Sequence, residues 1–476
     1  MFKTILQKYH VKRQFLITSL KYSSQIPEAP KQTLLNSLLN LVNYERAYKF
    51  HHYVDGNHKK LGPIYRDKIG PVSAVFLNSP EDYQKIFRYE GATPRHFLPE
   101  AWLLYNDMRK CQRGLLFMDG EEWQYYRKII NKIMVSPYSL KDVVIKSSFA
   151  AADDLSKELK IYSDNQQVIP AIERRLYRWS IEVMMSVLMG STWNSYKQIG
   201  RIEAEKLAGI LHKVFEISAK LSLLPAKYAM KLRLPVWQEF VKVADETLDL
   251  TRKLVPQMES YGGDGLLFLM KQEGIQDDNL IKIVTDLILA AGDTTAYSTQ
   301  WALFLLSTHQ NIQDEFAKQV STLEVNEIIG NSYAKGILKE SLRLYPTAPF
   351  LTRILPEKKN ICGYDLSGGE LILMSLYSSG RNPLNFYQPN EFIPSRWLRN
   401  EKGNFDGVHN SYGSLPFALG VRSCVGKKLA ETQMTLLLSQ LVKNYKINCS
   451  NATKIDIKLH LISVPSEPIL FYLTKR

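Results

Sequence analysis

The sequence predicts a mainly α-helical protein with small β-sheets, built as one large domain. Apolar residues recur at three- and four-residue steps through most of the middle of the chain, which is the spacing of amphipathic helices. Segments with the β-branched and aromatic content of strands are fewer and shorter. Because strands do not alternate with helices, a doubly wound α/β fold is excluded. No linker, charge block or internal repeat divides the 476 residues.

The individual elements follow from the same patterns. We expect helices at 121–134, 173–189, 203–221, 235–255, 278–308 and 332–344, and a further helix directly after residue 426. Strand-like segments occupy 71–78, 368–377 and 468–474. The expected architecture is a helical body with a small sheet near each end of the chain.

The first 27 residues are basic and amphipathic. They contain five Lys and Arg residues and no acid, and their apolar residues recur at roughly helical spacing. This pattern is typical of a mitochondrial transit peptide, and the alternative is a disordered basic tail. The longest apolar run, 15–17, is too short to span a bilayer or to form a signal-peptide core. We expect a transit peptide at 1–27 and the folded domain at 28–476.

The chain is basic even without this segment. Its formal charge is +14, and 56 basic residues against 47 acidic ones remain when the five basic residues of the leader are removed. Such a charge favours an acidic protein partner or an anionic membrane surface. Nucleic acid is not expected as a partner, because no basic stripe with interleaved aromatic residues and no binding motif is present.

Cysteines are scarce. Four in so long a chain argue against a disulfide scaffold, and the absence of a CxxC pair removes the framework of a zinc site. Cys424 lies in the segment PFALGVRSCVG (416–426), just before a predicted helix. The positive end of that helix, together with Arg422, Lys427 and Lys428, favours a thiolate. We therefore predict a functional thiolate at Cys424.

Two glycines flank this cysteine. Gly420 and Gly426 permit tight backbone turns and the close approach of a flat partner. The alternative interpretation, a buried structural cysteine, leaves both glycines and Arg422 unexplained.

The spacing FxxGxRxCxG resembles the haem-binding signature of the cytochrome P450 family, in which a cysteine thiolate ligates the haem iron. The family's ExxR motif is matched by Glu340 to Arg343, and its meander motif by the segment 392–397, which contains Arg396. The resemblance covers essentially everything after the leader. It implies a single-domain cytochrome P450 fold, with haem b held between a long oxygen-activation helix and the helix that follows the cysteine loop, and with Cys424 as the axial ligand of the iron.

The resemblance also gives the two motifs a role. It implies that Glu340, Arg343 and Arg396 form a buried charge network that supports the haem loop. An isolated ExxR would be only an ion pair on a helix surface.

The long predicted helix contains the string AAGDTT (290–295). Gly, Asp and Thr are poor helix formers, and their presence together in the middle of a helix indicates a functional site. By resemblance this is the oxygen-activation groove, where Thr294 hydrogen-bonds dioxygen, the co-substrate, and Asp293 relays protons. The alternative, a purely packing helix, has no use for an adjacent acid and alcohol.

Further residues are assigned to the haem by resemblance alone. Trp123 and Arg127 match the family's propionate-binding helix, while Arg353 and Arg422 match arginines near the propionates. Phe417, Gly420 and Gly426 complete the haem loop. Taken singly, each arginine could equally be an exposed side chain.

Four lysines imply a partner. Lys335 and Lys339 lie one turn apart on a predicted helix, and Lys427 and Lys428 follow the cysteine loop. In mitochondrial members such positions dock an acidic, adrenodoxin-like ferredoxin that an NADPH-dependent reductase supplies with electrons; the alternative is a solvated lysine face. With the leader, this implies a mitochondrial enzyme in peripheral contact with the matrix side of the inner membrane.

Longer strings resemble one branch of the family, the arthropod ecdysteroid 2-hydroxylases. Examples are PEAWLLYN (99–106), CQRGLLFMDGEEW (111–123) and ILKESLRLYPTAPF (337–350). The resemblance implies a steroid monooxygenase of moulting-hormone biosynthesis that converts the ecdysteroid 2-deoxyecdysone to ecdysone. Alternatives are a hydroxylase acting on another carbon of an ecdysteroid or sterol, a haem-thiolate isomerase or dehydratase, and a haem-binding carrier.

The expected substrate pocket has apolar walls from three segments, 93–116, 287–291 and 349–351, because apolar walls with few polar anchors suit a rigid sterol. The haem loop departs from the family at Ala418, where many members have Gly.

Overall fold

The computed structural model describes residues 25–30, 48–69, 72–110, 114–135, 140–222 and 225–476. The expected transit peptide at 1–27 therefore lies almost entirely outside the described residues. Within these ranges, no helix combines the length and the apolar character needed to cross a membrane.

The helices are α4 (Phe50–Leu61), α5 (Pro80–Tyr89), α6 (Glu100–Arg109), α7 (Gly120–Val135), α8 (Lys141–Asp164), α9 (Ile172–Met189), α10 (Trp193–Leu221), α11 (Ala226–Lys231), α12 (Pro235–Ser260), α13 (Leu266–Gln272), α14 (Asp277–Thr308), α15 (Gln310–Val320), α16 (Val325–Gly330), α17 (Ser332–Leu344), α18 (Leu376–Gly380) and α19 (Lys427–Asn444). The strands are β1 (Ile64–Ile69), β2 (Val72–Leu77), β3 (Phe350–Ile354), β4 (Lys359–Ile361), β5 (Tyr364–Leu366), β6 (Leu371–Ser375), β7 (Tyr445–Cys449), β8 (Ile457–His460), β9 (Ile462–Pro465) and β10 (Phe471–Lys475). The predicted class, mainly α with small sheets, is confirmed.

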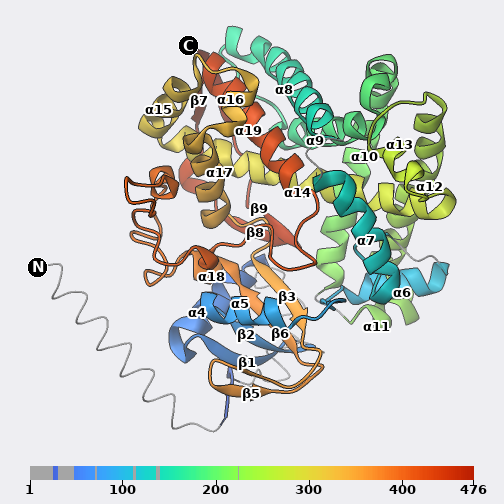
Figure 1. The fold of residues 1–476 in the computed structure, drawn as a ribbon, viewed down its shortest axis with the longest axis vertical. Helices are drawn as coiled ribbons and strands as arrows, with labels where there is room; N and C mark the ends of the chain where they lie inside the picture. Colours follow the sequence, from blue (N-terminus) through green and yellow to red (C-terminus); the bar gives the residue numbers. More distant parts are fainter. Residues whose placement is uncertain (1–24, 31–47, 70–71, 111–113, 136–139, 223–224) are drawn as a thin grey trace, which may run out of the picture.

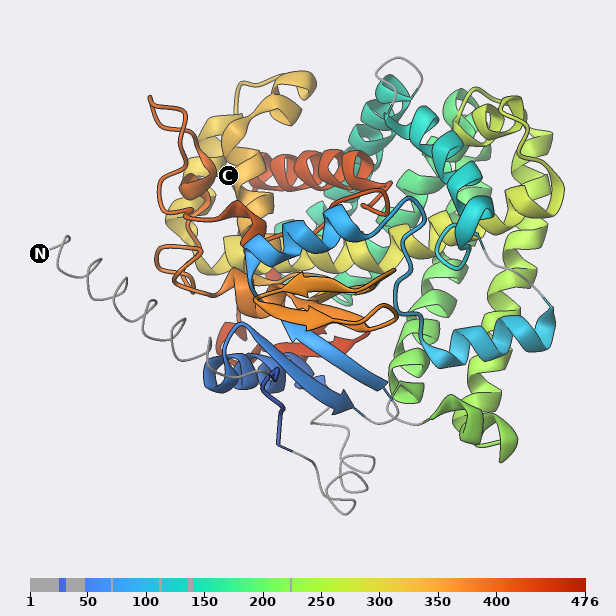
Figure 2. The ribbon, with the colours of Figure 1, turned by 60° about the horizontal axis from the view of Figure 1, so that its bottom comes forward.

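Helix α14 runs through the middle of the molecule (Figures 1 and 2). It packs against α9, α10, α12, α17 and α19, and also reaches β7 and β9. Two aspartates in its first turn interact favourably with the positive end of the helix dipole. From Ile283 to Ser307 nearly every side chain is buried. A helix apolar on all sides is one that other helices surround, so α14 is the scaffold on which a central site can be built.

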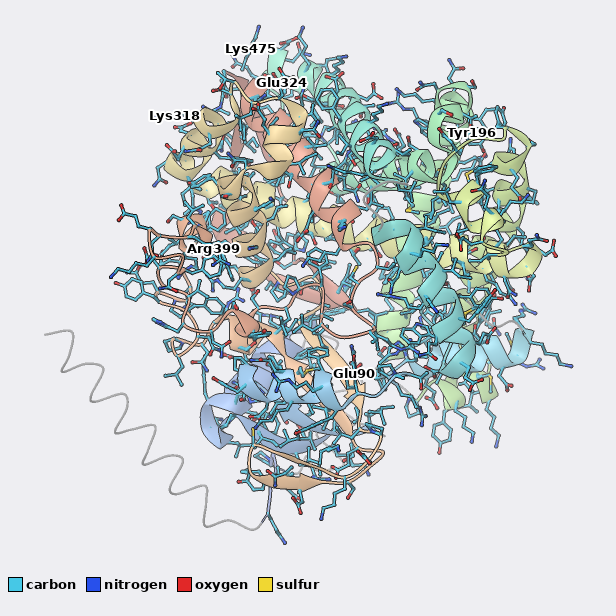
Figure 3. All side chains as sticks on the ribbon, viewed as in Figure 1. Glu90, Tyr196, Lys318, Glu324, Arg399 and Lys475 are labelled. Carbon is cyan, nitrogen blue, oxygen red and sulfur yellow. The ribbon has the colours of Figure 1, made fainter. Side chains whose placement is uncertain are left out.

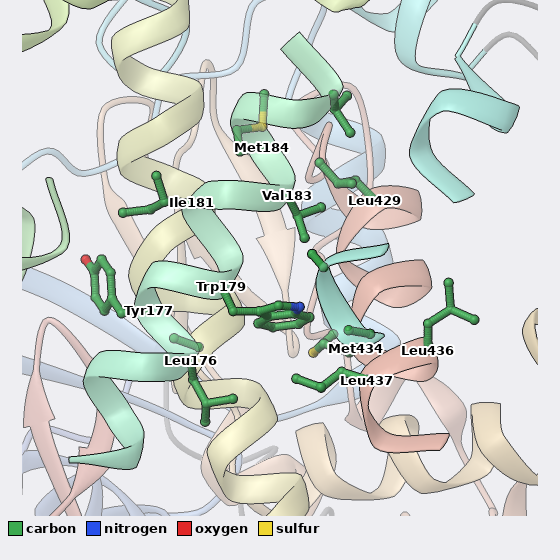
Figure 4. Packing of buried hydrophobic residues seen from close by; sticks show 14 of the residues in the cluster. Leu176, Tyr177, Trp179, Ile181, Val183, Met184, Leu429, Met434, Leu436 and Leu437 are labelled. Atoms are coloured by element: carbon green, nitrogen blue, oxygen red, sulfur yellow. The ribbon is translucent and has the colours of Figure 1, made fainter. Parts of the chain in front are cut away.

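The main core joins α9, α14 and α19. Trp179 of α9, which is 1% exposed, points toward Met434 and Leu437 of α19 (Figure 4). An indole of this size removes about 200 Å² of apolar surface from water and fixes the spacing of the two helices. The helix that follows Cys424 is thereby held in place by packing along its length.

The principal sheet has the strand order β1-β2-β6-β3. Strand β2 pairs in parallel with β6, so that Val75 faces Ile372, and both strands contribute to a second hydrophobic cluster. The expectation of separate sheets near each end of the chain is wrong for this pair of segments, since 72–77 and 371–375 lie in one sheet. Figure 2 shows this sheet beside α5 and apart from α10–α13. The remaining sheets are two-stranded: β7 with β10, β4 with β5, and β8 with β9.

Most predicted helices agree with the structure within one residue, but two boundaries were wrong. α10 begins at Trp193 rather than 203, and its internal Gly200 is required there, because a Cβ would lie 2.5 Å from the Trp193 ring. α12 continues past Pro256 to Ser260, beyond the expected end at 255. Strand β6 covers only part of 368–377, because α18 begins at Leu376.

Candidate active site

The cysteine loop is a compact turn in front of α19. The Cys424 amide donates to the Phe417 carbonyl at 2.9 Å, which closes the loop, and α19 starts three residues after the cysteine with Gly426 as its N-cap. The Cys424 side chain is accessible. The predicted position just before a helix N-terminus is confirmed, and the thiol lies on the open side of the loop.

Gly420 allows a buried carboxylate to reach the loop. Its φ of 76° belongs to the left-handed region, and a Cβ would lie 1.9 Å from Oε1 of Glu90. Glu90, which directly follows α5 (Figure 3), accepts from the Val421 amide at 3.0 Å and from Arg353 Nε at 2.5 Å. Sequence reasoning missed Glu90, a single acid outside every motif.

Gly426 differs from Gly420 in its backbone conformation and in the space around it. Its φ is −83°, and an added Cβ would lie 3.9 Å from Cys424 Sγ, an ordinary contact distance. The expectation that Gly426 permits a special turn is therefore not met by the backbone. What this glycine provides is open space next to the sulfur.

Three predicted cations converge on the loop. Arg422 lies over the Trp123 ring at 4.1 Å from its centroid and donates to Asp119 Oδ1 at 2.6 Å. Arg127, one turn further along α7, donates to the Ser423 carbonyl. Burial, together with the charges of Arg353 and Arg127, lowers the pKa of Arg422 to about 10 although Asp119 acts in the opposite direction, so these three guanidinium groups lie in one cluster.

This cluster fits an anionic group. The Nε atoms of Arg127 and Arg422 are buried and have no hydrogen-bond partner. Leaving buried donors unpaired is costly, and nearby cations repel one another, so an anion between them would satisfy both demands. Haem propionates have this chemistry, and the residues present therefore fit the haem. Arg353 has less need of such an anion, because the carboxylate of Glu90 already balances its charge.

Two opposing influences act on the Cys424 thiol. The predicted influences were the helix end, Arg422, Lys427 and Lys428. In the structure the Cys424 side chain is accessible, but the protein packed around it desolvates the sulfur and raises the pKa of the thiol, and the Gly426 amide, Arg127 and Lys427 offset part of this rise. The Gly426 amide and these two cations therefore favour the thiolate, in opposition to burial. Coordination to a metal ion deprotonates a thiol outright, so a bound haem iron would itself stabilise the thiolate.

Helix α14 presents a small accessible strip to the same region. Ala290, Ala291 and Thr294 are accessible or half-buried, whereas their neighbours along the helix are buried. Gln433 of α19 donates to Thr295 of α14 at 3.4 Å, so the two helices meet next to this strip. An accessible patch within a buried helix marks an internal space, which suits a flat group held between α14 and the cysteine loop.

The AAGDTT segment is not a break in the helix. Thr294 Oγ1 donates to the Ala290 carbonyl at 2.6 Å, Ser298 to the Thr294 carbonyl at 2.7 Å, and Ser180 of α9 to the Ala291 carbonyl at 2.6 Å. Each of these backbone carbonyls accepts a hydrogen bond from a side-chain hydroxyl, and α14 stays continuous. The expected local cost is thus offset by side-chain hydroxyls.

Asp293 and Thr294 face different surroundings. Asp293 is 1% exposed, neither of its oxygens has a hydrogen-bond partner, and burial raises its pKa. Its nearest ionisable neighbours are His212 of α10 and Tyr177 of α9. The adjacent Thr294 is partly accessible. The two predicted catalytic residues are therefore present next to each other but open toward opposite environments.

The predicted charge network is assembled around Glu340. Arg343 donates to both carboxylate oxygens, at 2.7 and 2.9 Å, and Arg396 Nε donates to Oε1 at 2.8 Å. All three side chains are at most 2% exposed. Trp397 Nε1, which sequence reasoning missed, donates to Oε2 at 2.8 Å.

Most of the predicted docking lysines share one surface. Lys335, Lys339 and Lys427 are exposed and lie close enough to Glu431 to lower its pKa, which burial raises. Lys428 is also exposed. Glu431 was not anticipated. It is an acid within the basic surface, on the first turns of α19 and on the side of the cysteine loop.

The first expected pocket wall, 93–116, is bonded to residues directly next to the other two. The Phe97 amide donates to Thr352 Oγ1 at 3.1 Å, and the Leu116 amide donates to Asp286 Oδ2 at 3.0 Å. These bonds connect segment 93–116 to the strand after α17 and to α14. Phe97 and Leu116 remain 40% and 46% exposed, so apolar surface is available along this wall.

Known proteins resemble this chain along nearly its whole length. The cytochrome P450 family model matches residues 29–473. Cytochrome P450 315a1, mitochondrial, of Drosophila melanogaster is 35% identical over 473 residues, which cover 95% of this chain and 88% of that protein. The mitochondrial cholesterol side-chain cleavage enzyme of Oncorhynchus mykiss is 28% identical over 462 residues, covering 92% and 88%. The mitochondrial 1,25-dihydroxyvitamin D(3) 24-hydroxylase of Mus musculus is 28% identical over 463 residues, covering 94% and 89%.

A family match along nearly the whole chain agrees with a thiol in front of a helix, clustered cations beside it and an accessible strip on the central helix. Members of this family bind haem through a cysteine thiolate and use dioxygen. The chain therefore belongs to the cytochrome P450 family and is a haem-thiolate monooxygenase.

Proposed function

We propose that this enzyme is a mitochondrial steroid hydroxylase that converts 2-deoxyecdysone to ecdysone with electrons from an acidic ferredoxin. The observation that carries the steroid class is the set of relatives, two of which are named for cholesterol and for a vitamin D compound. The choice of carbon 2 rests on the strings that resemble the ecdysteroid 2-hydroxylases. The apolar wall of Phe97 and Leu116 suits a rigid steroid.

The residues at the site divide the work. Cys424 would hold the haem iron, while Arg127 and Arg422, the latter stacked on Trp123, would bind the propionates. The bound haem supplies oxygen activation and transfer of one oxygen atom to a C–H bond of the substrate. Thr294 holds a hydroxyl proton on the accessible side of α14, and Asp293 holds an exchangeable proton on the buried side. Glu340 and its two arginines hold the segment 380–407, to whose backbone carbonyls the arginines donate.

A ferredoxin partner is supported by the basic surface. Lys335, Lys339, Lys427 and Lys428 lie on the side of the cysteine loop, and positive patches steer acidic proteins into contact. The names of the relatives, which call them mitochondrial, support the same compartment.

A peripheral membrane contact is also supported. Tyr228 of α11 and the following Leu232 are 64% and 68% exposed, and lysines flank them at 227 and 231. Exposed apolar residues among cations favour the surface of an anionic bilayer. We place this contact at the matrix face of the inner mitochondrial membrane.

Product identification is the decisive experiment. The purified holoenzyme is reconstituted with reduced ferredoxin, incubated with 2-deoxyecdysone, and the product is identified by mass spectrometry and NMR. Ecdysone is the expected product. Oxidation of another steroid, with none of 2-deoxyecdysone, would favour the second candidate, a sterol or ecdysteroid hydroxylase acting elsewhere.

Thiolate ligation has its own test. The ferrous–carbon monoxide spectrum of the wild type should show the red-shifted Soret band, and Cys424→Ala should lose it. A band that survives this substitution would contradict the assignment. A haem-thiolate isomerase, which needs no electrons, is disfavoured by the Asp293–Thr294 pair and would be revealed by turnover without ferredoxin.

A further inference from the structure

Asp293 is a buried acid whose immediate surroundings do not satisfy it. Its side chain is 1% exposed and neither carboxylate oxygen accepts a hydrogen bond. Burying an unpaired carboxylate costs several kcal/mol, so such a group is retained where a function requires it. A proton held on a buried acid must also be replaced after use. The question is therefore which group connects Asp293 to solvent.

His212 of α10 is placed to make this connection. Its Nδ1 atom lies 4.0 Å from Asp293 Oδ1 and 3.3 Å from the hydroxyl of Tyr297, while 45% of its side chain is exposed. The same imidazole thus touches a buried acid on one side and an accessible space on the other. Tyr297 holds the ring at its Nδ1 edge, which is the edge that faces the acid.

The close approach of α9 completes the enclosure. Tyr177 packs directly on Gly292, where a Cβ would lie 2.6 Å from the tyrosine ring. The hydroxyl of Tyr177 is buried without a partner, and the ring centroids of Tyr177 and His212 are 6.5 Å apart. Gly292 therefore lets α9 cover Asp293, so that the described residues leave His212 as the ionisable side chain that is both near the acid and substantially exposed.

The groups that face His212 come from every element packed around it. They are Glu173 and Tyr177 of α9, Glu216 of α10, Asp293 and Tyr297 of α14, and His460 of β8. Three of these groups are acids and one is a second histidine. The acids raise the pKa of His212, and Asp293 contributes most to this rise. In turn, His212 offsets part of the rise that burial causes in the pKa of Asp293.

We infer that His212 is the proton-relay residue that reprotonates Asp293 from solvent during turnover. The inference deepens the proposed function, because it rests on Asp293 holding a proton for the reaction. The imidazolium loses its proton at Nδ1 and the Asp293 carboxylate gains it. A hydronium ion from solvent then protonates the neutral imidazole again at Nδ1 and leaves as water. A side-chain rotation or one bridging water closes the 4.0 Å gap before transfer.

The coupling between the two groups can be measured without turnover. The holoenzyme is labelled with ¹³C-histidine and titrated by NMR in its diamagnetic ferrous–carbon monoxide form, with the His212 resonance assigned from His212→Gln. His212 should titrate above its usual value of 6.5 in the wild type and return toward that value in Asp293→Asn. An unchanged titration in Asp293→Asn would overturn the inference, and this result does not depend on which steroid is oxidised.

The second readout is the product formed per NADPH consumed. In the wild type this ratio should fall as the pH rises through the raised pKa of His212, because the neutral imidazole has no proton to give. His212→Gln should lower the ratio by about tenfold and remove this pH dependence. A pH profile that persists in His212→Gln would contradict the relay.

A matched control distinguishes the relay from loss of any half-exposed histidine. His52 lies 3.8 Å from Asp456 and is 43% exposed, but its acid is 52% exposed, whereas Asp293 is buried. His52→Gln should keep both the coupling ratio and its pH profile. If His52→Gln has the same effect as His212→Gln, the inference fails.

Discussion

Two buried carboxylates in this enzyme have opposite surroundings. Glu340 accepts hydrogen bonds from Arg343, Arg396, Trp397 and the Ile393 amide, and its side chain is fully buried. Asp293 is equally buried and accepts none. A carboxylate with all its acceptor sites filled holds surrounding structure in place, whereas an unsatisfied one is a cost to stability. The difference separates an acid that builds the site from an acid that can exchange its proton.

The largest expected effect is at Glu340. Glu340→Gln removes the negative charge between two buried guanidinium groups and should destabilise the fold by roughly 3–5 kcal/mol, because Arg343 and Arg396 then lack a counter-charge. Denaturant unfolding of the holoenzyme and the carbon monoxide spectrum measure this loss. Glu401→Gln, at an exposed position, is the control and should change neither. Full retention of stability in Glu340→Gln would mean that the network is not structural.

Asp293→Asn should keep the stability of the fold and lose activity, whereas Glu340→Gln loses stability. Because burial raises the pKa of Asp293, the folded protein binds its proton more tightly than the unfolded chain, and the stability that this proton brings is lost as the pH rises through the raised value. Asn carries no charge, so the variant should be at least as stable as the wild type at neutral pH.

The effect of Asp293→Asn should be on the reaction rate instead. Product formation by Asp293→Asn should fall by about 10²-fold, since the amide cannot donate a proton as an acid does. Thermal unfolding and steady-state product formation provide the two measurements. A variant that is both destabilised and active would place Asp293 with Glu340 as a structural acid.

Thr294 tests the accessible side of the same helix. Thr294→Ala should bind haem normally and consume NADPH, but product per NADPH should fall roughly tenfold as electrons are diverted to peroxide. Its hydroxyl bonds only to the Ala290 carbonyl of its own helix, so the cost to stability should be small. Thr294→Ser keeps the hydroxyl and should restore coupling. If Ser behaves like Ala, packing by the methyl group is responsible.

The contrast between the two acids also explains what could be predicted. Glu340 belongs to a motif with fixed spacing, and the helix that carries it was predicted at its observed limits, 332–344. Glu90 belongs to no motif, and the string HKVFEIS (212–218), which resembles one branch of the family, gives His212 no role. Both residues are defined by contacts to residues distant in sequence, such as Val421 and Asp293, and no local pattern signals such contacts.

Helix α8 was missed for a related reason. Its buried face includes Ser147, Ser148, Ser156 and Ser163, and the contrast between apolar and polar faces is therefore weak. The hydroxyl of Ser147, for example, accepts from Ser186 of α9 at 2.7 Å, so the face is satisfied by polar packing. The sheet that joins β2 to β6 was missed because its two strands are almost 300 residues apart in sequence. Hydrophobic periodicity detects neither kind of contact.

The smallest expected effect is at Ala418, where the chain departs from the family. Its φ is 56°, a left-handed conformation that costs a residue with a Cβ about 1 kcal/mol. Ala418→Gly should therefore stabilise the cysteine loop, by up to about 1 kcal/mol in the unfolding of the holoenzyme, after the greater entropy of glycine in the unfolded chain is subtracted. Ala430→Gly, the same substitution within α19, should instead destabilise by about 1 kcal/mol, because there the backbone is helical. If both variants change the free energy of unfolding in the same direction, backbone strain at Ala418 is relieved elsewhere in the loop.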